Sequence, residues 1–264
     1  MKKRGLLFTL PLLLTAMAAC DNIDEKDRYI EVENRPLARK VLLEEFTGQD
    51  CVNCPAAHAV IEKLEEQFEG NLIVVSIHAG NFGRPASEGG LMQEEGDVYA
   101  KKWGVTAYPS GVVDENSGVL NFDGWSTAIR KDGYYPSDME LDMNAYLSSD
   151  GKTINVECDL TSDVSASGHL QLWVVEDGII GFQRDGNNRI YDYVHNNVFR
   201  GCVNGVWGQE ITISRGESQN FYNTTEMHTV QPEEIDNWNP DNLYIVGFVY
   251  NDSGVLVVNR CKIS

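Results

Sequence analysis

Two cysteines separated by two residues are the part of this sequence best suited to chemistry. Cys51 and Cys54 lie in FTGQDCVNCPAAHAVIEKL, followed by Pro55 and by apolar residues at helical spacing. Cysteines three positions apart at a helix start are close enough to bridge. The free amides and dipole of that helix end also stabilise a thiolate. The pair therefore predicts thiol–disulfide exchange, in which Cys51 attacks and Cys54 resolves the mixed disulfide.

Strands and helices alternate around this motif. The expected order is strand, helix, strand, helix, strand, strand, at VLLEEF (41–46), residues 55–68, NLIVVSIHA (71–79), the segment through Trp103, SGVVD and GVLNFDG. The run at 71–79 is apolar almost throughout, which is typical of a central strand buried on both faces. The pattern predicts an α/β domain over residues 38–135, with helices covering a mixed sheet.

From residue 136 the sequence changes to short β-rich segments separated by turns. These segments are INVECDL, LQLWVVED, IYDYVHNNVF, EITIS, LYIVGFVY and VLVVNRCKI. They predict a second domain, an all-β antiparallel sandwich over residues 136–264. Cys158 alternates with apolar neighbours in INVECDL and is expected in the core. Cys158, Cys202 and Cys261 cannot all pair with one another, and their pairing stays open.

The first domain resembles the thioredoxin fold. VLLEEF with FTGQDCVNCP is similar to the family's first core strand and active-site turn, and WGVTAYPSGVVD is similar to its cis-proline segment. The resemblance implies a cis Tyr108-Pro109 step that docks the substrate chain beside the cysteines. It also implies that Glu45 is a buried carboxylate beneath the site. Burial would raise the Glu45 pKa and let it exchange a proton with Cys54, whereas the alternative for Glu45 is a solvated edge position.

Two features of the motif differ from the thioredoxin pattern. Asp50 stands where that family has a tryptophan, and its negative charge is expected to raise the pKa of Cys51 and slow attack. The pair Val52-Asn53 matches neither reductases nor strong oxidants, so the motif predicts no redox potential. A metal site formed by both cysteines with His58 or His78 would leave the cis-proline segment unexplained. We therefore expect no metal and no cofactor.

The chain begins MKKRGLLFTLPLLLTAMAAC, which has a basic start, a short apolar run and small residues before Cys20. This pattern predicts a lipoprotein signal peptide over residues 1–20, with Cys20 carrying the lipid, rather than a membrane-spanning helix. A plain secretory signal is the alternative. Residues 21–37 are acidic and aperiodic, which indicates a flexible tether. We expect a lipid-anchored protein of the outer membrane, on its periplasmic or surface face, although Asp21 can mark inner-membrane retention in some lipoproteins.

Charge restricts the partners. The chain carries 21 basic and 40 acidic residues, and removing residues 1–19 leaves 18 basic against 40 acidic, a formal net charge of −22. Such a protein repels nucleic acid and anionic lipid surfaces. The expected partners are the membrane, reached through the lipid anchor, and envelope proteins that bear thiols or disulfides.

A closer resemblance covers nearly all of the mature chain. The lipobox, FTGQDCVNCP, LWVVEDGIIGFQ and YVHNNVFRGCVNGVWGQEI are together similar to the outer-membrane-protein-28-related lipoproteins. That resemblance implies an α/β thioredoxin-like domain followed by an all-β immunoglobulin-like sandwich domain. Two functions remain in competition. One is thiol–disulfide exchange at Cys51 and Cys54; the other is a redox-silent binding or structural role with a permanent Cys51–Cys54 disulfide.

Overall fold

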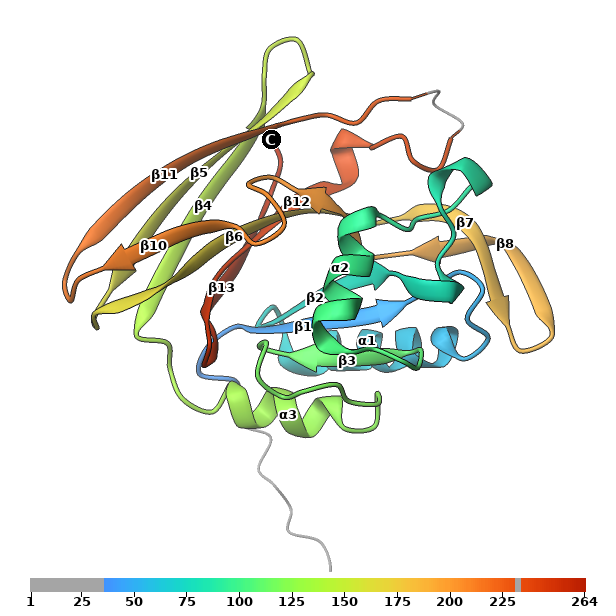
Figure 1. Ribbon diagram of the computed structural model, residues 1–264, viewed down its shortest axis with the longest axis horizontal. Helices are drawn as coiled ribbons and strands as arrows, with labels where there is room; N and C mark the ends of the chain where they lie inside the picture. Colours follow the sequence, from blue (N-terminus) through green and yellow to red (C-terminus); the bar gives the residue numbers. More distant parts are fainter. Residues whose placement is uncertain (1–35, 231–233) are drawn as a thin grey trace, which may run out of the picture. The chain divides into compact units, whose positions relative to one another are not determined.

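One mixed sheet of eight strands connects the first third of the chain with the last (Figure 1). It is seen in a computed structural model that describes residues 36–230 and 234–264. The α-helices in these residues are α1 (Cys54–Phe68), α2 (Glu94–Trp103) and α3 (Trp125–Asp132). The strands are β1 (Val41–Thr47), β2 (Leu72–His78), β3 (Ser110–Val113), β4 (Met139–Leu147), β5 (Thr153–Ser162), β6 (Ala166–Glu176), β7 (Ile179–Asp185), β8 (Asn188–His195), β9 (Val198–Cys202), β10 (Gln209–Ile213), β11 (Ser218–Glu226), β12 (Leu243–Asn251) and β13 (Gly254–Lys262).

The order of strands in the large sheet is β13-β12-β6-β9-β2-β1-β3, and β10 pairs with β6. β1 and β2 are parallel, whereas β3 runs antiparallel to β1. The two halves meet at β2 and β9, where Ser76 pairs with Val198. There the Ser76 amide donates a 2.6 Å hydrogen bond to the Asn197 carbonyl oxygen. The edge of β2 is therefore paired with a strand that comes more than 100 residues later in the sequence.

This joint corrects the expected fold class. An α/β thioredoxin-like domain followed by a separate immunoglobulin-like sandwich domain is the wrong description, because a single sheet runs through both regions. The described residues are mostly β-structure, in mixed and antiparallel sheets. From Pro36 to Ser264 the chain forms one compact unit. The physical reason is the open edge of β2, which buries its polar backbone groups by pairing with β9.

The local elements around the motif follow from their sequences. α1 starts at Cys54, with proline in its first turn, and buries Ala57, Ile61, Leu64 and Phe68 on one face, as their spacing predicts. The strands expected at 41–46 and 71–79 and the helix through Trp103 are also confirmed. The prediction of a strand at GVLNFDG, after SGVVD, is wrong. Gly111 and Leu120 make only an isolated bridge, and the chain then forms α3.

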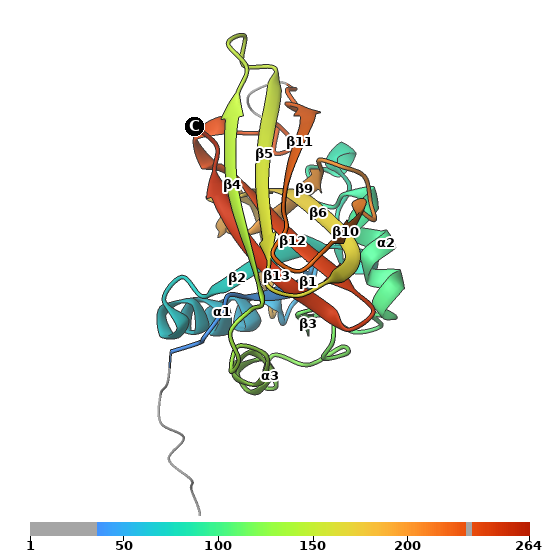
Figure 2. The ribbon, with the colours of Figure 1, turned by 90° about the vertical axis from the view of Figure 1, so that its left-hand side faces the viewer.

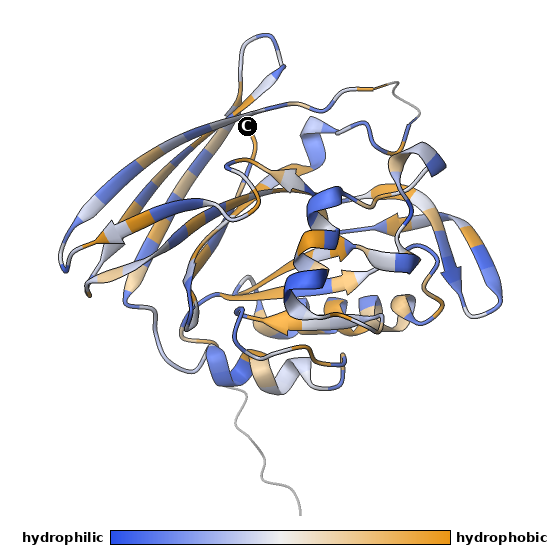
Figure 3. Cartoon of the chain, in the orientation of Figure 1, coloured by the Kyte–Doolittle hydropathy of each residue, from blue (hydrophilic) through white to orange (hydrophobic). Residues whose placement is uncertain are grey.

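Both faces of the large sheet are covered. On one face, α1 and α3 pack against β1, β2 and β3 in a cluster that includes Leu43, Val74 and Trp125. On the other face, α2 packs in a cluster that extends from Phe46 through Trp173 to Phe248. The inner strand β2 is accordingly hydrophobic over most of its length, whereas β11 is mostly hydrophilic (Figure 3).

A second, three-stranded sheet has the order β11-β5-β4. It packs against the β6, β12 and β13 part of the large sheet (Figure 2). Cys158 is 1% exposed in the core between these sheets, which confirms its expected burial. Cys202 and Cys261 are partly buried and, like Cys158, unpaired.

β7 and β8 form a two-stranded hairpin apart from both sheets. A turn at Asp185-Gly186-Asn187 closes it, because Asp185 pairs with Asn188 and Gly186 has a positive φ of 55°. The expected strand IYDYVHNNVF is in fact two strands, β8 and β9, since Asn197 adopts a left-handed conformation between them. This break turns the chain from the hairpin into the large sheet.

The expected signal peptide, the lipid-bearing Cys20 and most of the tether fall in residues 1–35, outside the described residues. Leu37, expected at the end of the tether, is 8% exposed and packs in the core with Val41. Within the described residues, none of the helices combines the length and apolar character needed to cross a bilayer.

Candidate functional site

The Cys51–Cys54 pair is disulfide-bonded at the start of α1, with Cα atoms 5.5 Å apart. β1 brings the chain to this point, and its last residue, Thr47, is followed by the turn that carries both cysteines. The Cys51 amide donates a 3.0 Å hydrogen bond to the Gly48 carbonyl oxygen, which closes the turn. The pair thus lies at a helix amino terminus, where amide groups and the dipole favour a thiolate once the bond is reduced.

The Tyr108-Pro109 bond is cis, as the resemblance implies. β3 begins directly after it, and Ser110 pairs with Phe46 near the end of β1. The Tyr108 ring packs at 5.6 Å on the ring of Phe82, whose carbonyl oxygen accepts a 3.0 Å hydrogen bond from the Asp50 amide. Tyr108 and the cysteine turn therefore contact the same loop.

Arg84 pairs with Asp50, the residue before Cys51. Its Nε and Nη2 atoms donate hydrogen bonds of 2.6 Å and 2.9 Å to the two carboxylate oxygens. This hydrogen-bonded contact lowers the pKa of Asp50, and Arg184 and Arg189 act in the same direction. The charge that the sequence places beside Cys51 is therefore paired with a cation, which weakens its expected effect on the thiolate.

Glu45 is fully buried, as the resemblance implies. Its Oε2 atom accepts a 2.6 Å hydrogen bond from the Ser76 hydroxyl. Its Oε1 atom lies 3.2 Å from Nε2 of His58, which is one helical turn after Cys54. Burial alone would lower the pKa of His58, but the charge and hydrogen bond of Glu45 outweigh it and raise that pKa. A buried, compensated carboxylate is thus bound to His58, one helical turn along α1 from Cys54.

The β7–β8 hairpin covers the cysteines. Cys51 is 2% exposed and Cys54 is fully buried. The amides of Arg184 and Gly186 donate to the carbonyl oxygens of Gln49 and Val52, at 2.8 Å and 3.1 Å. The hairpin backbone therefore pairs with the cysteine turn on both sides of Cys51.

One buried side chain fixes this cover. The Gln183 amide group is 3.1 Å from the Cys51 carbonyl oxygen and 3.3 Å from that of Gly48, and it donates to both. In return, the Gln49 side chain donates at 3.1 Å to the Phe182 carbonyl oxygen. The guanidinium of Arg84 also lies 4.1 Å from the centre of the Phe182 ring. These contacts shield Cys51 from solvent.

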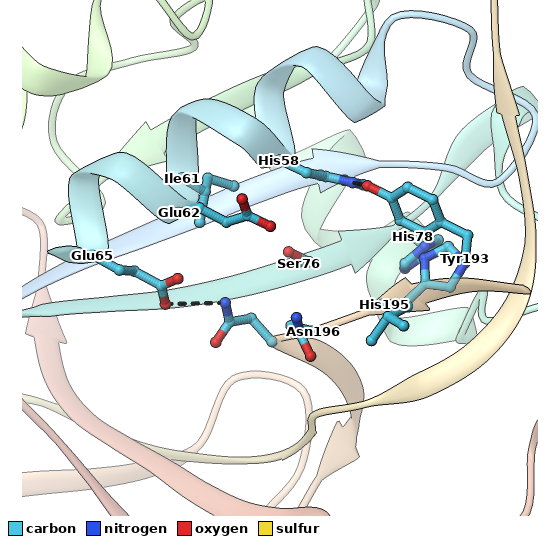
Figure 4. A pocket seen from close by; sticks show the side chains of 11 residues that line it. His58, Ile61, Glu62, Glu65, Ser76, His78, Tyr193, His195 and Asn196 are labelled. Atoms are coloured by element: carbon cyan, nitrogen blue, oxygen red, sulfur yellow. Dashed lines mark hydrogen bonds between the residues drawn. The ribbon is translucent and has the colours of Figure 1, made fainter.

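A small polar cavity of about 40 Å³ lies between α1, β2 and the end of β8, next to this cover (Figure 4). His58, Ser76, His78 and His195 line it. The rings of His78 and His195 are 5.4 Å apart. Burial lowers the pKa of His195 to about 4 and that of His78 well below its ordinary value, so both rings are neutral near pH 7. The volume suffices for a water molecule or two.

The metal alternative finds no support in this geometry. Among residues 36–230 and 234–264, no group of three or more histidine, cysteine, aspartate or glutamate side chains is arranged to hold a metal ion. His58 bonds to Glu45 and Tyr193, and His78 packs on His195 rather than on the cysteines.

The sequence analysis missed three contributors to the site: Arg84, Gln183 and Tyr193. Tyr193 projects from β8, and its hydroxyl is 2.7 Å from Nδ1 of His58. Gln183 and Tyr193 lie in the second half of the chain, and nothing in their local pattern points to residues 45–58. Arg84 carried a visible signal, since it is a cation in the Gly-rich loop that follows β2.

Comparison with solved structures shows a shared fold. HBP35 of Porphyromonas gingivalis superposes with a TM-score of 0.65 at 13% sequence identity, covering 86% of this chain and 76% of that one. Protein AGR_C_4864 from Agrobacterium tumefaciens gives a TM-score of 0.48 at 15% identity, with coverage of 86% and 95%. A search of curated protein sequences gave no significant match.

The sequence of the second half identifies the family. The model of the family described as "Outer membrane protein Omp28" matches residues 96–264, well over half of the chain. The match begins after the cysteine pair, so it does not bear on Cys51 and Cys54. The family's name indicates the outer membrane as the location. This chain belongs to the Omp28 outer membrane protein family.

Proposed function

We propose that this protein carries out thiol–disulfide exchange with envelope proteins through Cys51 and Cys54. The observation that carries the proposal is the fully buried Glu45 carboxylate, placed behind the helix turn of the cysteines. Before any partner compensates for it, the burial of a carboxylate costs a free energy on the order of several kcal/mol. A structural disulfide has no need of such a group, whereas a resolving thiol needs a proton acceptor.

The chemistry requires only the chain's own groups. The Cys51 thiolate attacks a client disulfide, forms a mixed disulfide and releases one client thiolate. The Cys54 thiol then gives its proton to Glu45, and its sulfur attacks Cys51, which releases the second client thiolate. The client gains two electrons and the pair becomes the disulfide seen in the structure. The opposite direction, oxidation of client thiols, uses the same groups, and no cofactor enters either one.

Client access requires the hairpin to move. Cys51 is 2% exposed beneath β7 and β8, and the carbonyl oxygens of Gln49 and Val52 are already occupied by hairpin amides. An extended client segment would need these same backbone acceptors, close to the cis Tyr108-Pro109 step. Access therefore requires β7 and the turn after it to release Gln49 and Val52, whereas the contact of Tyr193 with His58, made from β8, is separate and stays in place.

Cysteine variants test this function. Cys51→Ser should abolish reduction of a model protein disulfide, whereas Cys54→Ser should keep the first attack and accumulate mixed disulfides with clients. Ser at each position keeps the size of the side chain, so the two variants control for one another. Equal behaviour of both variants and the wild type would contradict the mechanism.

The burial of Cys51 favours a second candidate, a redox-silent envelope protein in which the disulfide is permanent. Under this alternative the hairpin locks the bond, and the function lies elsewhere on the chain. Reduction by a small phosphine distinguishes the two. A locked bond would resist the reagent until the protein unfolds, whereas a gated bond would react at the rate of hairpin opening.

The proposal also includes a lipid anchor at Cys20, which would hold the protein on the periplasmic or the surface face of the outer membrane. The sequence ending in Met17-Ala18-Ala19-Cys20 supports it. Mass spectrometry of the mature amino terminus should find acylated Cys20, and Cys20→Ala should release the protein from membranes. Protease treatment of intact cells would then assign the face. An unmodified terminus with unchanged membrane association would contradict the anchor.

A further inference from the structure

A chain of polar contacts leads from the interior near Cys54 to the surface of the hairpin. Glu45 Oε1 is 3.2 Å from His58 Nε2, and His58 Nδ1 is 2.7 Å from the Tyr193 hydroxyl. Figure 4 shows His58 and Tyr193 meeting across the gap between α1 and β8. Solvent exposure increases along this series of contacts. Glu45 is fully buried, the His58 side chain is 17% exposed and Tyr193 is half-buried.

Cys54 lies at the inner end of these contacts. Cys54 and His58 are four residues apart in α1 and share one face of the helix. Helical side chains lean toward the amino terminus, so the His58 ring lies over the turn that holds Cys54. Cys54 itself has no exposure to solvent. A proton leaving its thiol therefore needs protein groups to reach water.

We infer that His58 and Tyr193 form a proton relay between the Cys54–Glu45 pair and solvent. The inference rests on the proposed exchange reaction and adds two residues to it. When Cys54 attacks the mixed disulfide, its thiol proton passes to Glu45, the new Cys51–Cys54 bond forms and the client sulfur leaves with the electron pair of the broken bond. Glu45 then passes the proton to Nε2 of His58, Nδ1 gives its own proton to the Tyr193 hydroxyl, and Tyr193 releases one to water.

His58 is the ring suited to this role. The titratable groups that face it come from each packed element: Glu45 in β1, Glu62 in α1, His78 in β2, and Tyr193 and His195 in β8. Burial opposes its protonation, but the two glutamates outweigh that effect and raise the His58 pKa. His78 and His195 have lowered pKa values and remain neutral. Of the three rings, only His58 has a raised pKa, so it is the one that takes up a proton most readily.

The position of Tyr193 gives the hairpin a second role. β8 carries Tyr193 on the same hairpin whose β7 strand covers Cys51 through Gln183. The hairpin thus shields the cysteines through β7 and completes the exit for the proton through β8. The Thr47 hydroxyl, 3.0 Å from His58 Nε2, holds the ring in line with Glu45.

The test follows the reduced protein as it reacts with an aromatic disulfide reagent in a stopped-flow instrument. Cys51 attack releases the first coloured thiolate, and Cys54 attack releases the second. The variants are His58→Gln and Tyr193→Phe, and Tyr191→Phe is the matched control because Tyr191 is 69% exposed on the same strand. We expect the second release to slow by roughly tenfold or more in His58→Gln and severalfold in Tyr193→Phe. The pH profile of that release should lose the inflection that His58 supplies.

The outcomes separate the relay from a structural role. A variant that merely loosens the hairpin would speed the first release, whereas loss of the relay slows only the second. If the wild type releases both thiolates and the two variants match Tyr191→Phe in rate and pH profile, the relay is wrong and the exchange function stands. If the wild-type protein never releases the second thiolate, both the relay and the proposed exchange function are wrong. If His58→Gln does not fold, the comparison of Tyr193→Phe with Tyr191→Phe decides.

Discussion

Arg84 pairs with Asp50 through two hydrogen bonds, of 2.6 Å and 2.9 Å, directly before the first cysteine of the pair. The carboxylate that would hinder a neighbouring thiolate is thereby matched by a guanidinium. Both side chains are about 30% exposed, so the pair contributes little to stability and acts mainly on local charge.

Removing this cation should therefore slow Cys51. In Arg84→Gln, the free Asp50 charge disfavours the Cys51 thiolate, and we expect attack on an aromatic disulfide at pH 7 to slow by roughly three- to tenfold. Titration of thiolate absorbance would show the ionisation moving to higher pH. Adding Asp50→Asn to Arg84→Gln should restore the wild-type curve. An unchanged rate in Arg84→Gln would mean that the carboxylate does not influence Cys51.

Gln183 should control access to the disulfide. Its amide group donates to the carbonyl oxygens of Cys51 and Gly48 from a fully buried position. Gln183→Ala removes these bonds, each worth roughly 1 kcal/mol, and should speed reduction of the bond by a phosphine by about tenfold. Asn188→Ala, at an exposed position near the hairpin turn, is the control. Hydrogen exchange at the Arg184 and Gly186 amides should speed in parallel, and equal rates in both variants would show that the hairpin does not gate the bond.

Acid should destabilise the protein through its buried histidines. Burial lowers the pKa of His195 to about 4, whereas the unfolded value is about 6.5. Between these values the unfolded chain binds more protons, so the free energy of unfolding falls as the pH drops from about 6.5 to 4. The loss from His195 should be on the order of 1–3 kcal/mol.

His195→Gln should flatten this dependence, as measured by denaturant unfolding at pH 7 and pH 4.5. His58 has the opposite sign: its raised pKa contributes stability at low pH that is lost as the pH rises through the folded value. A His195→Gln variant with the full wild-type pH dependence would contradict the assignment to that ring.

The continuous sheet predicts a single unfolding transition for residues 36–264. Phe199 in β9 is 1% exposed and packs on Trp173 and Tyr99, at the joint between the two halves. Phe199→Ala should cost about 3–5 kcal/mol and lower the stability of both halves together. Tyr135→Ala, at a 71% exposed position, should change stability by less than about 1 kcal/mol. Two separate transitions, with only one shifted by Phe199→Ala, would restore the view of independent domains.

The sequence was informative wherever the signal was local. β1, α1 and β2 follow from apolar periodicity, and the start of α1 at Cys54 follows from the proline that comes next. The cis step before β3 and the burial of Glu45 follow from the resemblance. α3 was missed because only Trp125 and Ile129 are buried in its eight residues, too few to show a helical period.

The rest depends on contacts between distant segments. β2 and β9 are joined through Ser76 and Val198, and no local pattern specifies that pairing. The same holds for Gln183 over Cys51 and for Tyr193 beside His58, which lie 132 and 135 residues apart in sequence. The expected fold class was wrong for this reason.

The most direct test is the equilibrium reduction potential of the Cys51–Cys54 pair in the purified full chain, measured against a series of thiol buffers. Exchange at this site predicts a value in the range of known exchange proteins, roughly −270 to −120 mV, reached within hours in the folded state. A potential well below roughly −300 mV, with a bond that reacts only after unfolding, would contradict the account and make the disulfide structural.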